Sequence, residues 1–269
     1  CNVYMSNIEK REKKSMMSGF HAFWSLGVLF GSLITSFFLE LNYSFIFNII
    51  IYVIILLPLS IYFVLCLESQ VEEKTEDSSK KNIFFMWPLI IFLLALIAMA
   101  NAITEGSVDA WGALYMRDYI KVDGFYIGLA TLSFNIFMVL GRLSGDWVRD
   151  KIGVFLLILF LFLSTIISLI ILANFNHIIA AMIGFSLLGI GASSIVPIAY
   201  SLAGKIEGID SGVGITIISI AVYGTFIGAP ASLGFIANNY GINNIFIPML
   251  IIFVILILPI SFYRKKFLI

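Results

Sequence analysis

Long apolar runs separated by short polar segments set the pattern of this chain. A helix that crosses the hydrocarbon core of a bilayer needs about 20 consecutive, mostly apolar residues. By this measure we predict eight transmembrane helices. They fall at residues 20–39, 44–66, 86–108, 125–145, 152–173, 178–203, 212–237 and 245–263.

Composition supports the same environment. Of the 269 residues, 61% are hydrophobic and 12% are charged, whereas soluble domains average about 25% charged residues. No soluble core could bury this much apolar surface, so the lipid bilayer must act as the solvent. Cys1 and Cys66 offer neither a disulfide framework nor the spacing of metal ligands. We therefore expect an all-α membrane protein without a metal site.

Basic residues alternate between the connections, and this alternation tests the helix count. Of the 16 Lys and Arg residues, 14 lie at the two ends or in every second connection, and only Arg117 and Lys121 lie on the opposite side. Cytoplasmic loops carry the excess of Lys and Arg. We predict that both ends of the chain face the cytoplasm at the cell membrane. The balanced net charge gives no indication of a nucleic-acid partner.

Two predicted helices share a pattern of glycines. Gly27 and Gly31 align with Gly224 and Gly228 at a constant offset of 197 residues. Small residues four apart let helices approach closely in lipid, so two unrelated packing helices would also explain the match. A parallel repeat of six helices explains it as well, and it implies a parent of roughly 390 residues in twelve spans. The present chain would then lack about four N-terminal spans.

A short segment, "GRLSGDWVRDKIG" at 141–153, carries a family resemblance. We predict that it lies in a cytoplasmic loop. It resembles the Gly-x-x-x-Asp-Arg-x-Gly-like signature of the major facilitator superfamily, with Gly145, Asp146, Arg149 and Gly153 in the pattern. Trp147 departs from it, because an Arg usually follows the Asp. Segments 18–27, 193–204 and 223–237 also look like the sugar-transporter and fucose-permease-like branch.

This resemblance implies an organisation for the whole chain, as helices five to twelve of twelve. Residues 1–67 would be the last two helices of an N-terminal six-helix bundle, and 84–269 the C-terminal six-helix bundle. The mixed-charge segment 68–83 reads as a solvated cytoplasmic linker between them. The implied function is secondary transport of a small polar organic solute, such as a sugar, together with protons, by a full-length monomer.

The signature segment is our candidate cytoplasmic gate, made of Gly141, Arg142, Gly145, Asp146, Arg149 and Gly153. A tight turn needs glycine where backbones crowd or φ is positive. Asp146 can cap the N-terminus of the next helix, because its negative charge is stabilised at the positive end of the helix dipole. Arg142 and Asp146 are four residues apart, so they can pair if the helix continues that far. A basic loop held inside only by the orientation rule is the alternative.

Asn101, Glu105 and Asp109 form a polar stripe at helical spacing at the end of an apolar run. Ionisable groups at membrane depth normally face a bundle interior or a water-filled cavity. A carboxyl there can couple protons to solute movement if its protonation changes between states. The alternative places both acids in the external headgroup zone; we favour the cavity for Glu105 and the headgroup zone for Asp109.

Four further residues are candidates for the pathway or for helix bending. His21 could relay protons, although a position at headgroup level fits it better. Asn135 either binds a polar solute or bonds another helix, and the second role is favoured. Pro197 and Pro230 each remove a backbone hydrogen bond, which permits bending or is repaired by neighbouring helices. Trp111 and Tyr115 could stack on a sugar, but an interfacial aromatic belt is the commoner role.

Enzyme motifs are absent from the sequence. It contains no Walker loop, no paired-His metal motif and no nucleophile elbow on a plausible strand. We therefore expect no enzymatic activity and no cofactor. A non-transporting membrane receptor, an assembly subunit of the same fold or an inactive fragment remains the alternative function.

Overall fold

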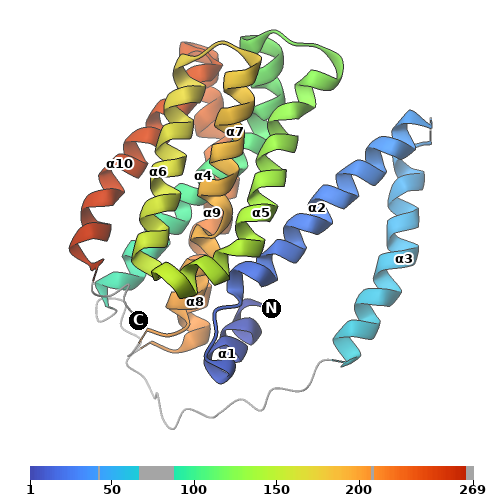
Figure 1. Cartoon of the computed structure of the whole chain (residues 1–269). Coiled ribbons are helices and arrows are strands. Elements are labelled where there is room, and N and C mark those ends of the chain that lie inside the picture. The colour runs from blue at the N-terminus through green and yellow to red at the C-terminus, as the bar shows by residue number, and fades with distance from the viewer. Residues whose placement is uncertain (42, 67–87, 207–208, 265–269) are drawn as a thin grey trace. The chain divides into compact units, whose positions relative to one another are not determined.

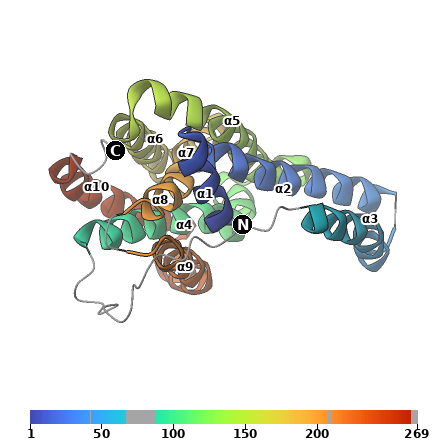
Figure 2. The ribbon, with the colours of Figure 1, turned by 90° about the horizontal axis from the view of Figure 1, so that it is seen from below.

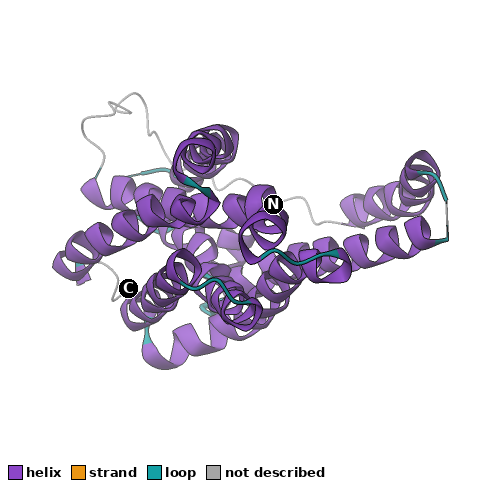
Figure 3. Ribbon diagram, turned by 90° about the horizontal axis from the view of Figure 1, so that it is seen from above, coloured by secondary structure: helices purple, strands orange, loops and turns teal. Residues whose placement is uncertain are grey.

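The structure is a computed structural model that describes residues 1–41, 43–66, 88–206 and 209–264. This part of the chain is helical almost throughout and contains no strand (Figures 1 and 3). The first helices are α1 (Asn2–Glu12), α2 (Met17–Glu40), α3 (Phe45–Cys66), α4 (Leu89–Tyr115) and α5 (Leu129–Ile152). They are followed by α6 (Val154–Asn174), α7 (Ile178–Ser193), α8 (Ile195–Ala203), α9 (Ser211–Tyr240) and α10 (Phe246–Phe262).

Two compact units divide the chain. Cys1–Ser25 and Phe84–Ile269 form the first unit, and Leu26–Ile83 forms the second. The first unit therefore holds α1, the first turns of α2 and helices α4 to α10, and both candidate sites lie within it. The segment 68–83, which we predicted to be a linker, lies outside the described residues.

Seven helices of the described chain are long and apolar enough to cross a membrane, which makes this a multi-pass, all-α membrane protein. They are Ile46–Cys66, Leu89–Ile120, Gly124–Ile152, Val154–Asn174, Ile178–Ala203, Ser211–Tyr240 and Ile242–Phe262. These correspond to seven of the eight predicted spans. The remaining prediction, 20–39, falls on α2, a helix of 24 residues that is not among the seven.

Two spans extend well beyond their predicted ends. The span expected at 86–108 continues as α4 to Tyr115. The span expected at 125–145 continues as a helix to Ile152, so most of the signature segment is helical instead of forming a loop. The polar side chains after residue 141 lowered the hydropathy there without ending the helix. The turn comes at Gly153, whose φ of 83° lies in the left-handed region that glycine adopts without strain.

Close packing organises the first unit. α7 packs along both α5 and α6, while α4 packs along α9 (Figures 1 and 2). A Cβ at Gly189 of α7 would overlap the carbonyl oxygen of Phe134 and lie 3.0 Å from the Met138 nitrogen of α5. Glycine therefore lets the two backbones touch, as small residues do between helices in lipid.

The outer face of α6 suits contact with lipid. Large apolar side chains recur along it at helical spacing and stay about half exposed: Leu156, Phe160, Leu163, Ile167 and Ile170. A stripe of this kind on a soluble protein would be an aggregation hazard, but in a bilayer it is the expected surface.

Candidate functional site

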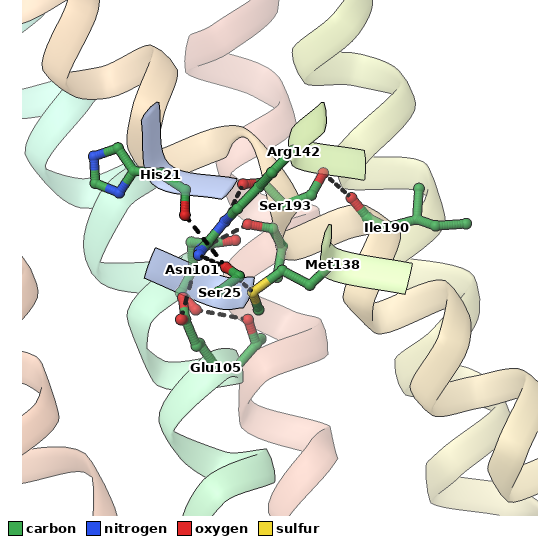
Figure 4. Close-up of polar contacts among 10 residues, drawn as sticks. His21, Ser25, Asn101, Glu105, Met138, Arg142, Ile190 and Ser193 are labelled. Carbon is green, nitrogen blue, oxygen red and sulfur yellow. Dashed lines mark hydrogen bonds and ion pairs between the residues drawn. The ribbon is translucent and has the colours of Figure 1, made fainter. Parts of the chain in front are cut away.

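A buried arginine is the centre of the first polar cluster. α5 presents Arg142, whose side chain is 3% exposed. Its Nε donates to the carbonyl oxygen of Ser193 at 3.0 Å, and its Nη1 donates to the hydroxyl of Ser25 (Figure 4). The guanidinium also lies 5.7 Å from the centre of the Trp24 ring. Segments far apart in the sequence thus meet at one charged side chain.

The ion-pair partner of Arg142 is Glu105 of α4. Arg142 Nη2 lies 3.5 Å from Glu105 Oε1, and the Glu105 side chain is 9% exposed. Glu105 is therefore buried against a cation within the first unit. Charges inside a membrane span are costly without a partner. Removing one member of a buried pair typically costs about 3–5 kcal/mol, because the other charge is left uncompensated.

A helix break explains why Arg142 and Asn101 point where they do. The sixth predicted span, 178–203, is interrupted at Ser194, between α7 and α8. Pro197 has no N–H, so the carbonyl of Ser193, four residues earlier, has no helical donor. Arg142 supplies that donor, and the neighbouring carbonyl of Ala192 accepts from Asn101 Nδ2 at 3.2 Å. Pro197 thus interrupts the helix as predicted, and neighbouring helices repair the lost bonds.

The other members of the predicted pathway lie differently. Asp109 is exposed, one turn beyond Glu105. The His21 ring stacks on Tyr200, with centroids 5.7 Å apart, and its Nε2 is buried without a hydrogen-bond partner in the described chain. Asn135 Nδ2 donates to Thr131 O of its own helix at 2.9 Å. Among the described residues, Asn135 forms no hydrogen bond to another helix, so the predicted bond between helices is not found there.

The second cluster holds the start of α2. An α-helix leaves its first four backbone N–H groups without helical partners. Here Glu9 Oε1 accepts from Met16 and Met17 at 2.8 and 2.9 Å. Asp146 accepts from Ser18 at 3.1 Å and from Gly19 at 2.7 Å. We call Glu9 and Asp146 the carboxylate clamp; they satisfy four consecutive amides and place negative charge at the positive end of the helix dipole.

This geometry corrects two predictions for the signature segment. Asp146 does cap a helix, but the helix is α2 and not the next one in the chain. The proposed pair of Arg142 with Asp146 is wrong, because Arg142 pairs with Glu105. The local four-residue spacing suggested a partner on the same helix, whereas the actual partner comes from α4.

Two glycines of the segment make room for other helices. A Cβ at Gly141 would lie 2.6 Å from Ser193 Cβ, and one at Gly145 would lie 3.2 Å from Ser18 Cβ. α5 can therefore approach both the α7–α8 break and the start of α2. Arg149, 6% exposed, donates to the Ser201 hydroxyl at 2.9 Å and lies 3.8 Å from Glu9 Oε1.

Glu9 is the member of the second cluster that sequence reasoning missed. Its side chain is fully buried, accepts from the Ser201 hydroxyl and lies 3.3 Å from Lys205 Nζ. Burial alone would raise the pKa of Glu9. The Met16 amide, the Ser201 hydroxyl and the charges of Lys205 and Arg149 outweigh that effect and hold the pKa below its ordinary value. No spacing rule points to Glu9, because its partners are set by tertiary packing.

The repeated glycines do not pack helices within their own units. A Cβ at Gly224 or Gly228 would meet no described atom within 4 Å, and the same holds for Gly27 and Gly31 within the second unit. Gly224 and Gly228 line an apolar groove of about 640 Å³ formed by α4, α9 and α10. Their role in helix packing stays a prediction.

Two other predictions concern single side chains. Pro230 lies inside an uninterrupted α9. Tyr115 is not in an aromatic belt: it is fully buried, donates to Leu172 O at 2.9 Å and packs on Phe185. A tyrosine in the core and one at the membrane interface are both flanked by apolar residues, so the sequence alone did not distinguish the two positions.

Comparison with known proteins identifies relatives among transporters. The chain is 27% identical to an uncharacterized MFS-type transporter of Yersinia pestis over 88% of its residues and 61% of that protein. It is 25% identical to an uncharacterized transporter of Sinorhizobium fredii, over 88% of the chain and 62% of that protein. The chain thus spans about three fifths of the length of these curated relatives.

A solved structure shares the fold. The crystal structure of the peptide transporter POT in complex with sulfate matches with a TM-score of 0.61 and 20% identity, over 69% of this chain and 39% of that one. A family model described as Major Facilitator Superfamily matches residues 2–205, a range that includes every residue of both clusters. The chain belongs to the Major Facilitator Superfamily.

Proposed function

We propose that the whole protein is a secondary active transporter that moves a small polar organic solute across the cell membrane by alternating access. Its family and the names of its relatives support this proposal. The carrying observation is the buried Arg142–Glu105 pair at the α7–α8 break. A membrane helix retains charges of this kind mainly for function, because they are costly to insert.

Proton coupling follows from the chemistry of this pair. A protonated Glu105 is neutral, so it no longer attracts the Arg142 guanidinium strongly. Arg142 is then free to hold a polar or anionic group of a solute, while Ser25 still orients it. Release of the solute restores the ion pair and favours loss of the proton. A sugar is the first solute to test, because segments 18–27, 193–204 and 223–237 resemble the sugar and fucose-permease-like branch.

The carboxylate clamp is the proposed cytoplasmic gate. Glu9 and Asp146 together accept four amides at the start of α2. Movement of α2 away from α5 would break the two bonds to Asp146, and movement away from α1 would break the two to Glu9, so the clamp favours the closed state. In this proposal α2 and α3 are helices five and six of twelve, residues 68–83 are the linker and 84–269 form the C-terminal bundle.

Solute-driven proton flux tests the proposal. The whole protein is reconstituted in liposomes with an internal pH dye, and hexoses and other small polar solutes are added outside. We expect at least one solute to move protons. Glu105→Gln should lower this flux at least about tenfold, because the amide cannot change its charge.

Substitutions of two other acidic residues serve as controls for Glu105→Gln. Asp123→Asn removes an exposed carboxylate outside the spans and should leave flux unchanged. Asp109→Asn removes the exposed acid one turn from Glu105 and should have a small effect. Full coupling in Glu105→Gln would contradict the mechanism. Saturable solute binding without any flux would instead favour the receptor alternative.

A further inference from the structure

A cavity of about 460 Å³ lies at the end of the first unit where α1, α5 and α6 meet. Five basic side chains line it: Lys10, Lys13, Lys14, Arg149 and Lys205. Only two carboxylates, those of Glu9 and Asp150, are among its lining groups. The excess of three positive charges distinguishes this cavity from the apolar groove on α9, and neither the proton step nor solute binding uses it.

Part of this charge is already balanced. Glu9 lies 3.3 Å from Lys205 Nζ and 3.8 Å from Arg149 Nη1, so these three groups form one buried network. Lys10, Lys13 and Lys14 are exposed, and none of them forms an ion pair within 4.0 Å in the described chain. Three lysines therefore face the cavity against the single remaining carboxylate of Asp150.

Backbone geometry adds to the positive potential. Gly153 and Val154, which begin α6, form part of the wall, and no side chain caps this helix of 21 residues. The amides of an uncapped first turn favour an anion. Lys13 adopts a φ of 51°, which is uncommon for a residue with a side chain and ends α1 so that Lys13 and Lys14 both line the cavity.

We infer that this cavity binds a phosphate-bearing anion, supplied either by the headgroup of an anionic lipid or by a free phosphate compound. Lysine ammonium groups and helix amides are the donors that bind phosphate oxygens. The volume fits a small ligand. The wall includes the adjoining ends of two membrane spans, α5 and α6. The ends of spans lie at the depth of the lipid headgroups. The inference does not depend on transport activity.

Binding to the full chain, purified in detergent, tests the inference. Native mass spectrometry measures the binding of a short-chain phosphatidylglycerol, and phosphatidylcholine serves as the zwitterionic comparison. Calorimetry measures the binding of inorganic phosphate. The combined variant Lys10→Gln, Lys13→Gln and Lys14→Gln should weaken binding at least about tenfold, since each basic residue near an anionic surface contributes severalfold. These lysines are exposed, so the variant should elute and melt like the unaltered chain.

A charge-matched control removes three cations outside the cavity: Arg11→Gln, Lys121→Gln and Lys151→Gln. It should keep binding within about twofold. Saturable binding of phosphatidylglycerol without phosphate assigns the lipid headgroup, and saturable binding of phosphate alone assigns a free compound. The inference is overturned if neither ligand saturates, or if both triple variants lose the same affinity.

Discussion

At the scale of single residues, two carboxylates bind the backbone amides that begin a helix. Glu9 and Asp146 each accept two N–H groups at the start of α2. Hydrogen bonds to ionised groups contribute about 1.5–3 kcal/mol each in favourable cases. The charge of these acids therefore matters to stability as much as their shape, and the charge depends on pH.

Acid should weaken the contact of Glu9. Its pKa is held below the ordinary value of 4.5, so the folded chain binds fewer protons at this site than the unfolded chain. The stabilisation is complete above pH 4.5 and is lost as the pH falls through the lowered pKa. We expect Glu9→Gln to reduce the free energy of unfolding by about 1.5–3 kcal/mol at neutral pH. This difference should shrink below pH 4.5.

Chemical unfolding in detergent at several pH values measures this effect. Glu12→Gln is the matched control, because Glu12 lies on the same helix but its side chain is 52% exposed beside Arg11. The control should differ from the unaltered chain by less than about 1 kcal/mol at every pH. A Glu9→Gln deficit that persists unchanged into acid would show that shape, and not charge, is what Glu9 contributes.

Sequence reasoning reached some of these residues and not others. Asn101, Glu105 and Asp109 were found together because helical spacing is a local property of the sequence. Glu105 proved buried and Asp109 exposed, and the difference depends on Arg142, which arrives from another helix. Glu9 had no local pattern at all. Contacts that form only through tertiary packing cannot be predicted from the local spacing of residues in a single sequence.

At the scale of elements, small residues decide how near the helices come. Gly189 lets α7 touch the backbone of α5, and Gly191 allows a similar approach to Leu161 and Thr165 of α6. Hydropathy predicted these spans well, because burial in lipid requires a long apolar run whatever its neighbours are. It could not predict that α5 continues through Arg142 and Asp146, since charged residues remain helical when other helices neutralise them.

Adding one methyl group at Gly189 should destabilise the fold. Gly189→Ala places a Cβ against the Phe134 carbonyl, and such overpacking costs about 1–3 kcal/mol. Gly224→Ala adds the same methyl group in α9, where no described atom lies within 4 Å. In this chain it should be neutral, or stabilising by up to about 1 kcal/mol through helix propensity. Thermal unfolding in detergent compares the two, and equal shifts would contradict close contact at Gly189.

At the scale of the whole molecule, the distribution of charge predicts orientation. Basic residues concentrate at one end of the predicted spans, and only Arg117 and Lys121 lie at the other. Superfamily membership agrees with a multi-pass protein but leaves the side of each end as a prediction.

Cysteine labelling in intact cells tests the orientation. In a background of Cys1→Ser and Cys66→Ser, Lys151→Cys should react with an impermeant maleimide only after permeabilisation. Val122→Cys should react without it, because it follows the two basic residues of the opposite side. Reaction of both positions from outside would overturn the predicted topology, and reversed accessibility would invert it.

The proline at the α7–α8 break has a consequence for selectivity. Because Pro197 has no N–H, the Ser193 carbonyl relies on Arg142 for a donor. A ligand that draws Arg142 away leaves that buried carbonyl without a donor, at a cost of about 1–3 kcal/mol. Only a ligand whose own bond to the guanidinium exceeds this threshold can displace it. The break would therefore filter out weakly binding molecules before any of them triggers a change of state.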